Sequence, residues 1–452
     1  MPKKKTALTI DKRLQQALVP AEEQPYDVPE NWVWTYISSG FDVTSSKRVH
    51  KSDWLSEGVP FYRTRELVKL SEQGYVDNEL FISEDLYKTF KKEFGVPQKN
   101  DLLISGVGTI GVPYVISDEK DFYFKDGNVI WLKNKGVFDA SYMYYLYKTV
   151  FIDNQIHSMS AGTTVDTYTI INAKNTIIPL PPLSEQQRIV ERIEELFAKL
   201  DEAKERLQEI ADSFALRKAA ILHKAFTGEL TKQWRRENGV SDESWEEKKF
   251  SEVAIIKSNL VSPFDYLDYP HIAPDSIEKF TGRLLSYRTI REDNVKSPKH
   301  LFYKGQILYS KIRPYLSKAI IADVDGLCSA DMYPIEALCN TKYLLKYMLS
   351  TEFLEQSTTA GSRSLLPKIN QRELSSISVP LPTLPEQHEI VRLIDALLAR
   401  ERSAQQAAEQ ALASIELMKK SILARAFRGE LGTNKASEVS AVELLKQVLA
   451  EN

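Results

Sequence analysis

The chain has 452 residues, of which 43% are hydrophobic and 27% charged, and its formal net charge is −3. This length predicts roughly two to four globular domains, and the near-neutral charge gives no overall sign of nucleic-acid binding. No apolar run approaches the roughly 18 residues that span a bilayer, the start has no apolar signal region, and the two cysteines cannot build a disulfide framework, so we expect a cytoplasmic protein.

An N-terminal arm, residues 1–28, and a first folded domain, residues 29–178, open the chain. The arm has a basic tip and a short helical pattern, followed by an acidic stretch with prolines. The domain alternates β-rich runs, such as 112–116 and 129–132, with Gly- and Asp-bearing turns, and an aromatic helical run follows at 142–147. The pattern predicts a mixed α/β domain.

A long helix is predicted within residues 179–230. It begins at Ser184, which forms a capping box with Gln187, and no Gly or Pro interrupts it before Gly228. About 42 residues at roughly 1.5 Å each would form a rod on the order of 60 Å long. Apolar residues recur along it at the spacing of a coiled coil, which predicts packing against a partner helix. The predicted packing residues are Val190, Ile193, Phe197, Leu200, Leu207, Phe214 and Ile221.

A polar linker, residues 231–244, leads to a second domain, residues 245–379, which weakly repeats the first. Trp245 matches Trp32 at the start of each domain. Further matches join 270–272 with 60–62 and 306–310 with 101–105. The two domains are therefore expected to share a framework and to differ in detail.

A second long helix is predicted within residues 380–431, and a tail with a short helix, residues 432–452, closes the chain. Pro385 falls in the first turn, where proline is tolerated. The segment repeats 179–230 at a constant offset of 201, with 22 of 52 aligned positions identical. Glu401 and Ala408 replace leucines of the first copy, so weaker packing is expected there. The predicted packing residues are Val391, Ile394, Leu398, Leu412, Ile415 and Ile422.

The sequence contains no pattern that predicts catalysis. Residues 106–111 match G-x-G-x-x-G, but a dinucleotide loop needs a helix next, and Pro113 stands in a strand-like run, so a tight turn is the better interpretation. There is no phosphate-binding loop of the Walker type, and the six histidines and two cysteines lack the spacing of a zinc site. We expect a protein that is not an enzyme and binds no metal.

Candidate binding residues form basic clusters and polar loops at corresponding places in the two domains. Residues 248–318 carry 13 Lys and Arg against 7 Asp and Glu, although a solvated basic surface is an equally good account of any one charge. Arginine can pair with guanine, and lysine mostly contacts phosphate. The candidates in the first domain are Lys47, Arg48, Arg63, Arg65, Ser105, Gly106, Gly108, Thr109, Gly162, Thr163 and Thr164. Those in the second are Arg283, Arg288, Arg291, Ser310, Lys311, Arg313, Ser362, Arg363 and Ser364.

The chain resembles the specificity subunit of a Type I restriction–modification system over nearly its whole length. The resemblance rests on the twice-repeated Pro-Leu-Pro-x-Leu-x-Glu-Gln opening, at 179–186 and 380–387, and on the twice-repeated Ala-Phe-x-Gly-Glu-Leu ending, at 225–230 and 426–431. The Pro-Glu-Asn-Trp start at 29–32 and the Leu-Thr-Lys-Gln-Trp-Arg exit from the first helix add to it.

This resemblance implies an α+β or α/β fold in which two target-recognition domains of mixed α/β structure are separated by two long antiparallel helices. The helices would form a pseudo-twofold symmetric coiled-coil spacer, and each domain would read one half of a bipartite site in double-stranded DNA. The implied partners are two methyltransferase subunits, which use S-adenosylmethionine, and restriction subunits with endonuclease and translocase activity, which use ATP and Mg²⁺. The chain itself would bind no cofactor and no membrane.

Three alternatives remain open at the level of the sequence. The first is a non-catalytic scaffold in which the helices serve only as a coiled coil. The second is the specificity module of another type of restriction–modification system. The third is a fused enzyme with its own methyltransferase or nuclease activity. The divergent, loop-rich domains between the helices favour the specificity subunit over the scaffold.

Overall fold

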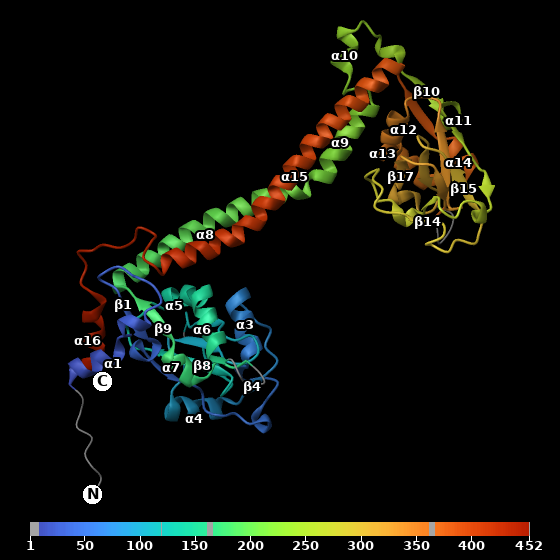
Figure 1. Cartoon of the computed structure of the whole chain (residues 1–452). Coiled ribbons are helices and arrows are strands. Elements are labelled where there is room, and N and C mark those ends of the chain that lie inside the picture. Colours follow the sequence, from blue (N-terminus) through green and yellow to red (C-terminus); the bar gives the residue numbers. More distant parts are fainter. Residues whose placement is uncertain (1–8, 119, 161–165, 361–366, 452) are drawn as a thin grey trace. The chain divides into compact units, whose positions relative to one another are not determined.

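The computed structural model describes residues 9–118, 120–160, 166–360 and 367–451 (Figure 1). Contacts divide the chain into two compact units, one made of residues 1–205 with 412–452 and the other of residues 206–411. The first unit holds the first domain, and the second unit holds the second domain. Each is described by itself.

The first domain is built on a four-stranded antiparallel sheet in the order β2-β8-β5-β6. A smaller sheet has the order β4-β3-β7, in which β3 and β7 are parallel, and β1 pairs with β9. The strands are β1 (Val33–Tyr36), β2 (Phe41–Thr44), β3 (Val59–Tyr62), β4 (Phe81–Ile82), β5 (Leu102–Ser105), β6 (Pro113–Val115), β7 (Tyr123–Phe124), β8 (Val129–Asn134) and β9 (Ile177–Leu180). The helices are α2 (Ile37–Gly40), α3 (Thr64–Gln73), α4 (Glu84–Phe94), α5 (Ala140–Tyr147), α6 (Val150–Ser160) and α7 (Ile170–Asn175).

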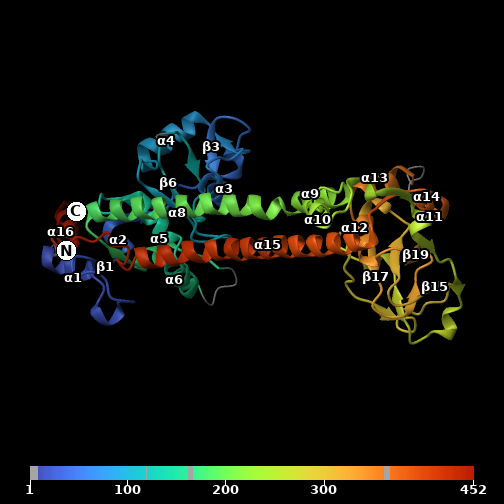
Figure 2. The same cartoon turned by 90° about the horizontal axis from the view of Figure 1, so that it is seen from above.

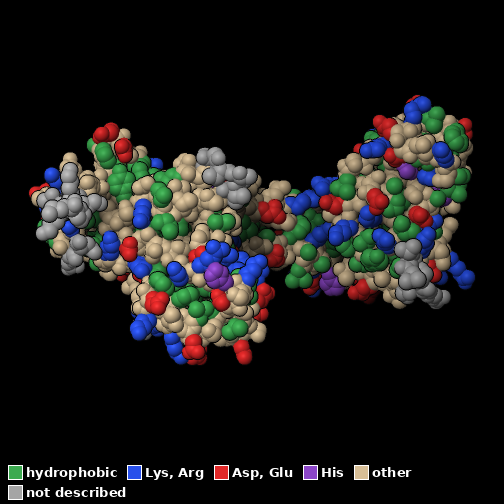
Figure 3. Space-filling model, turned by 90° about the horizontal axis from the view of Figure 1, so that it is seen from below, with side chains coloured by type: hydrophobic (Ala, Val, Ile, Leu, Met, Phe, Trp, Pro, Cys, Tyr) green, Lys and Arg blue, Asp and Glu red, His purple; other side chains and the backbone are tan. Residues whose placement is uncertain are grey.

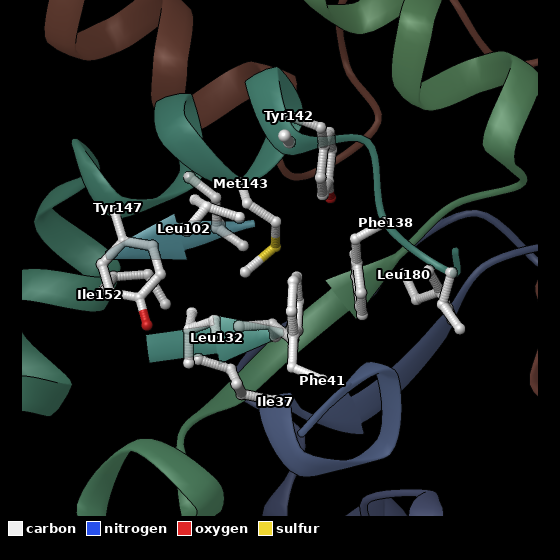
Figure 4. Close-up of a cluster of buried hydrophobic side chains, with 14 of the residues drawn as sticks. Ile37, Phe41, Leu102, Leu132, Phe138, Tyr142, Met143, Tyr147, Ile152 and Leu180 are labelled. Carbon is white, nitrogen blue, oxygen red and sulfur yellow. The ribbon is translucent and has the colours of Figure 1, made fainter. Parts of the chain in front are cut away.

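The main core of the first domain lies where the central sheet meets α2 and α5 (Figure 4). Leu102 of β5 and Leu132 of β8 are fully buried, beside Tyr142 and Met143 of α5. The continuous apolar runs of β5 and β8 follow from this position, because a strand covered on both faces does not alternate apolar and polar residues. The predicted strands and the predicted aromatic helix are confirmed here.

The second domain repeats this framework. Its four-stranded antiparallel sheet has the order β11-β19-β16-β17, β10 pairs with β20, and a five-stranded sheet has the order β12-β15-β18-β13-β14 with β13 parallel to β18. The strands are β10 (Glu246–Lys249), β11 (Ala254–Ile256), β12 (Leu260–Val261), β13 (Pro270–Ile272), β14 (Arg288–Thr289), β15 (Lys299–Phe302), β16 (Ile307–Ser310), β17 (Ala319–Ile321), β18 (Gly326–Cys328), β19 (Met332–Ala337) and β20 (Ser378–Leu381). The helices are α11 (Phe250–Val253), α12 (Thr341–Met348), α13 (Thr351–Ala360) and α14 (Gln371–Ser375).

The sequence matches between the domains correspond to equivalent strands. The match of 306–310 with 101–105 pairs β16 with β5, and each is third in the order of its four-stranded sheet. The match of 270–272 with 60–62 pairs β13 with β3, and each is parallel to one neighbour. The shared framework is therefore confirmed. Where the first domain has α3 and α4 after β3, the second has β14 and β15 after β13.

The repeated segments form the long helices α8 (Leu183–Asp212), α9 (Phe214–Phe226) and α15 (Leu384–Ala426). Figure 2 shows α15 beside α8 and α9. In the first unit Lys419 Nζ lies 2.6 Å from Asp201 Oδ1, and in the second unit Arg217 Nε lies 2.5 Å from Glu401 Oε2, so in both units the segments pair antiparallel. The expected antiparallel helix pair is confirmed within each unit.

The prediction that the first helix is uninterrupted was wrong, because it breaks at Ser213 between α8 and α9. The Ser213 hydroxyl donates to the carbonyls of Glu209 (2.7 Å) and Ile210 (3.2 Å). Arg217 also donates to the Ile210 carbonyl, at 3.1 Å. Side chains that occupy these acceptors compete with the backbone hydrogen bonds of the helix and bend it.

The predicted capping box of Ser184 was also wrong, because α8 begins one residue earlier, at Leu183. The Pro182 carbonyl accepts the backbone N–H groups of Glu185 (2.9 Å) and Gln186 (3.0 Å). Ser184 therefore lies inside the first turn instead of preceding it. Pro385 does stand in the first turn of α15, as expected.

The two ends of the chain pack together in the first unit. The arm forms α1 (Ile10–Ala17) and the tail forms α16 (Ala441–Glu451). Arg13 donates to the Leu449 carbonyl at 3.0 Å, and Ala441 and Leu445 join the main core of the first domain. Within the described part of the chain, no helix combines the length and the apolar character that crossing a membrane requires.

Candidate nucleic-acid interface

Two loops that the sequence selected separately lie together in the first domain. The turn between β5 and β6 is joined to the segment after α6 by a β-bridge between Val107 and Thr167. Tyr168 N also donates to the Gly106 carbonyl at 2.9 Å. The candidates Gly162, Thr163 and Thr164 lie outside the described residues, in the same connection from α6 to Thr167.

The second domain brings the corresponding loops together in the same way. Ile312 forms a β-bridge with Lys368, and Arg313 N donates to the Pro367 carbonyl at 2.8 Å. The candidates Ser362, Arg363 and Ser364 lie outside the described residues, just before this bridge. Each domain therefore has one pair of bridged loops at the end of an equivalent central strand.

The glycines of the first loop serve a tight turn, which supports that interpretation of the G-x-G-x-x-G string. A Cβ on Gly106 would lie 2.8 Å from the Tyr168 carbonyl oxygen, so only glycine allows the two loops to approach this closely. Gly108 and Gly111 have φ values of +82° and +79°. The strand β6 follows at once, where a cofactor loop would need a helix.

The serine at the start of each loop is buried, which corrects its selection as a DNA contact. Ser105 Oγ donates to the Thr109 carbonyl at 2.5 Å and accepts from Val112 N at 2.8 Å. Ser310 Oγ donates to the Ile312 carbonyl at 3.0 Å. Both hydroxyls therefore shape their loops, and because Ser105 is fully buried and Ser310 is only 2% exposed, they offer almost no surface to a base. Gly106 is buried as well, whereas Gly108 and Thr109 are exposed.

The basic candidates of the first domain differ in whether their charges are paired with carboxylates. Lys47 and Arg48 are exposed just after β2, and Lys47 Nζ lies 5.0 Å from the centre of the Phe94 ring. Arg63 makes two hydrogen bonds to Glu66, at 3.1 and 2.8 Å. Arg65 contacts Glu66 and Glu79, each at 2.5 Å. A phosphate would have to compete with these carboxylates for Arg63 and Arg65.

Glu66 is the buried centre of this ion-pair cluster. Burial alone would raise the pKa of its carboxyl, but hydrogen bonds from Arg63 and Arg65 outweigh burial and hold the pKa below its ordinary value. Arg63 N also donates to Glu66 at 2.9 Å, so the cluster caps the N-terminus of α3. Arg63 and Arg65 thus have a structural role that their sequence context does not reveal.

The basic candidates of the second domain are also divided. Arg283 binds Glu278 through two hydrogen bonds of 3.0 Å, and Arg291 lies 2.9 Å from Asp268. Arg288 is exposed at the start of β14 and has no ion-pair partner among the described residues. In Figure 3, Lys and Arg side chains gather over the first domain and are scattered among acidic side chains over the second.

Of the candidates in the loop after β16, only Arg313 presents its charge outward. Lys311 Nζ donates to the Ala330 carbonyl at 2.6 Å and lies 5.3 Å from the centre of the Tyr333 ring. Its ammonium group is therefore held against the domain. Arg313 is exposed, with φ +49° and ψ 58°.

The Pro-Leu-Pro stretch is a fixed joint between each domain and the helices of its unit. In both copies the first two residues of the stretch belong to the last strand of the domain, β9 or β20. These strands therefore extend past the predicted domain ends at 178 and 379. Gln186 donates to the Pro181 carbonyl at 3.0 Å and accepts from Asp139 N at 2.7 Å. Gln387 repeats both bonds, to the Pro382 carbonyl at 2.8 Å and from Asn340 N at 2.9 Å.

A buried glutamate completes each joint. Glu185 accepts from Trp32 Nε1 and from Asn434 Nδ2, both at 2.8 Å. Burial raises the pKa of this carboxyl, although the hydrogen bonds oppose the shift. The role of Glu185 was not predicted from the sequence. The signal that could have revealed it is the recurrence of this glutamate 201 residues later, together with a tryptophan at the start of each domain.

The second joint places Glu386 at the equivalent position. Its Oε1 accepts from Thr231 Oγ1 (2.6 Å), Arg235 NH1 (2.7 Å) and Trp245 Nε1 (3.1 Å). The side chains of Glu386 and Arg235 have exposed fractions of 0% and 7%, so this is a buried ion pair.

Each domain also packs on the end of the other repeated helix, within its own unit. The ring of Tyr142 lies edge-on to Phe427 with centres 5.0 Å apart, and Tyr343 lies likewise 5.4 Å from Phe226. These four residues form two pairs at the 201-residue offset. Gly429 makes room for the domain, because a Cβ there would lie 2.4 Å from Pro29 Cγ.

Some of the predicted helix-packing residues are buried and the others are half-buried. Those nearest the domains belong to the domain cores: Val190, Ile193, Val391, Ile394 and Leu398. Ile415 is also buried. The half-buried ones are Phe197, Leu200, Leu207, Phe214, Ile221, Leu412 and Ile422. At the two positions where weaker packing was expected, Ala408 is buried and Glu401 pairs with Arg217.

Residues 29–212 and 242–411 match the family model described as the Type I restriction modification DNA specificity domain. The chain is 42% identical over 303 residues to the Type I restriction enzyme EcoDI specificity subunit of Escherichia coli, covering 61% of this chain and 68% of the relative. It is 26% identical over 459 residues to the EcoBI specificity subunit of Escherichia coli, covering 92% and 90%.

Two solved structures share the fold. One is the HsdS subunit from Thermoanaerobacter tengcongensis, with a TM-score of 0.64 and 18% identity over 90% of this chain and 99% of that chain. The other belongs to a study of complex assembly and conformational transition in the type I R-M system, with a TM-score of 0.61 and 19% identity over 90% of this chain and 100% of that chain.

Proposed function

The chain belongs to the Type I restriction modification DNA specificity family, and from that membership we propose that it reads a bipartite DNA target, one half-site with each domain. The observation that carries this proposal is the repeated loop pair. Each domain holds two bridged loops at the end of an equivalent strand, β5 or β16, and joins its helices through an equivalent buried glutamate. Equivalent frames with different loops suit two half-sites of different sequence.

The reading surface that we propose combines the loop pairs with exposed cations of the same domain that make no ion pair to a described residue. In the first domain these are Gly108, Thr109 and the segment 162–164, with Lys47 and Arg48. In the second they are Arg313, Arg288 and the segment 362–364. Base contacts from exposed loops on a rigid sheet would specify sequence, and the cations would position the duplex through its phosphates.

The helices would act as a ruler that sets the distance between the half-sites. In DNA-binding dimers the separation of the two reading elements fixes the half-site spacing, and a pseudo-twofold repeat in one chain can do the same. A helix of 43 residues such as α15 is about 65 Å long at 1.5 Å per residue. The joints at Glu185 and Glu386 support this role, because helices can set a fixed spacing only if each recognition domain is attached to them rigidly.

The chemistry would belong to partner subunits. We propose that two methyltransferase subunits, which use S-adenosylmethionine, dock on this chain, and that restriction subunits that use ATP and Mg²⁺ join the complete complex. The chain would contribute recognition alone. Among the described residues, no group of three or more His, Cys, Asp or Glu side chains could hold a metal ion.

Selection from a pool of random duplexes, with the methyltransferase partner present, tests the proposal. The expected result is enrichment of a two-part sequence with a constant gap. Enrichment of no such sequence would reject the reading function and leave the scaffold. Transfer of labelled methyl groups by this chain without a partner would instead identify a fused enzyme.

Inserting one heptad into both long helices, at positions that face each other, tests the ruler. The gap between the enriched half-sites should lengthen, while both half-site sequences stay the same. The same insertion into the linker at 238–239 is the control and should leave the gap unchanged. A constant gap in both variants would refute the ruler.

A further inference from the structure

Arg313 stands in a left-handed backbone conformation at a position where the first domain has a glycine. Its φ is +49°, and the aligned residue Gly108 has φ +82°. The alignment follows from the structure, because β16 matches β5 and the next bridge is Ile312–Lys368 in one domain and Val107–Thr167 in the other. L-amino acids avoid this conformation because Cβ crowds the carbonyl oxygen, whereas glycine adopts it freely.

The surrounding structure holds Arg313 in this conformation from both sides. Its N–H donates to the Pro367 carbonyl at 2.8 Å, and its own carbonyl accepts from Leu316 N at 2.9 Å. Pro314, which follows, is buried. Strain of this kind persists where the neighbouring structure over-determines the backbone, and it is concentrated at functional sites.

The side chain of Arg313 is free, in contrast to its neighbours. It is exposed and makes no ion pair or hydrogen bond to any described residue. Nearby cations are engaged: Lys311 with the Ala330 carbonyl, Lys318 with the Pro274 carbonyl, and Lys368 with Asp331 at 3.3 Å. The loop therefore displays one unpaired guanidinium on a fixed backbone.

We infer that Arg313 is a specificity-determining residue of the second domain, and that it reads a guanine in the half-site of that domain. The inference rests on the proposed function. A guanidinium has a planar pair of donors that matches O6 and N7 of guanine in the major groove, and this is the commonest base-specific contact of arginine. A fixed backbone lowers the total entropy lost on binding, because only the side chain remains to be ordered on the base. The glycine at 108 leaves the first domain without this contact.

Selection of random duplexes by the full chain with its methyltransferase partner tests the inference, using Arg313→Gly, Arg313→Lys and Arg313→Ala. In Arg313→Gly and Arg313→Ala, one guanine of the second half-site should lose about 5- to 150-fold of its preference, which corresponds to about 1–3 kcal/mol at 1.4 kcal/mol per tenfold. Arg313→Lys should lose less, because lysine can also donate to guanine but lacks the planar pair of donors. The first half-site should be unchanged. Arg372→Ala removes another exposed arginine from the same domain, on α14, and should retain both half-sites.

Thermal unfolding separates reading from folding. Arg313→Gly should melt no lower than the unchanged chain, because glycine relieves the left-handed strain, and Arg313→Ala should melt below Arg313→Gly. A clearly lower melting temperature of Arg313→Gly would show that the arginine supports the fold, and would overturn the inference.

The remaining outcomes are also decisive. Retention of the guanine preference in Arg313→Gly would overturn the inference and leave the proposed function intact. An equal loss of affinity for all sequences, with a salt dependence reduced by about one phosphate contact, would show that Arg313 contacts a phosphate of the DNA. That result would overturn the inference as well. If the unchanged chain enriches no two-part sequence, the proposed function itself fails.

Discussion

The two joints between domain and helix have the same geometry but different electrostatics. Glu185 and Glu386 occupy equivalent first turns and both accept from a domain tryptophan. Each also has a threonine donor, Thr433 or Thr231, but the third donor differs, since Glu185 accepts from the neutral amide of Asn434 and Glu386 from the buried cation of Arg235. The repeat therefore preserves the position of the acceptor, whereas the partner comes from whichever segment follows the paired helix. The joints should respond differently to the loss of charge.

Replacing Arg235 by Leu should have the largest effect, because it leaves the carboxylate of Glu386 buried without its counter-ion. Removal of one partner from a buried ion pair typically costs about 3–5 kcal/mol. Denaturant unfolding of the second unit should show a loss of this size. Arg236→Leu, which removes an exposed neighbouring cation, is the matched control and should change little. An equal effect of both variants would remove the distinction between the joints.

Replacing each glutamate by glutamine sharpens the same comparison. Glu386→Gln removes the charge that Arg235 needs and should cost about 1.5–3 kcal/mol, the usual contribution of a hydrogen bond to a charged group. Glu185→Gln should cost much less, because an amide oxygen can still accept from Trp32 and Asn434 and its NH₂ can donate to Thr433, which now lies 3.4 Å from Glu185 Oε1. Unfolding free energies at pH 7 would measure the difference, and equal costs would contradict it.

The pH dependence of Glu185→Gln gives a second, smaller readout. Burial raises the folded-state pKa of Glu185 above its ordinary 4.5. The stability contributed by this group is therefore complete below pH 4.5 and is lost as the pH rises through the folded-state pKa. As the pH rises, the unfolding free energy of Glu185→Gln should therefore increase relative to that of the unchanged chain. Glu66→Gln should behave in the opposite sense, because ion pairs hold the pKa of Glu66 low and its contribution is lost as the pH falls.

Sequence periodicity predicted the long helices and the principal strands, because these depend on local spacing, and the repeat at a constant offset marked the Pro-Leu-Pro stretch without revealing its buried glutamate. Asp101–Ser105 and its match at 306–310 were recognisable since buried central strands keep an apolar run. The roles of Arg63 and Ser310 could not be predicted in this way. An arginine that binds a buried carboxylate and one that faces solvent look alike in a sequence, and the hydroxyl of Ser310 is buried only because its loop folds back on β16.

The smallest predicted effect concerns the break at Ser213, for which α15 is a natural comparison. Ser414 is the aligned residue, yet α15 continues through it, so serine alone does not end the helix. The added feature of the first copy is Arg217, which donates to the Ile210 carbonyl, where α15 has Met418.

Arg217→Met should therefore join α8 to α9, which would appear as slower hydrogen exchange at the Phe214 amide. The cost should stay below about 1 kcal/mol, because the ion pair of Arg217 with Glu401 is partly exposed. Glu401→Gln weakens that ion pair but leaves the Ile210 contact in place, so the break should persist. If Glu401→Gln closes it instead, the pairing with α15 causes the break.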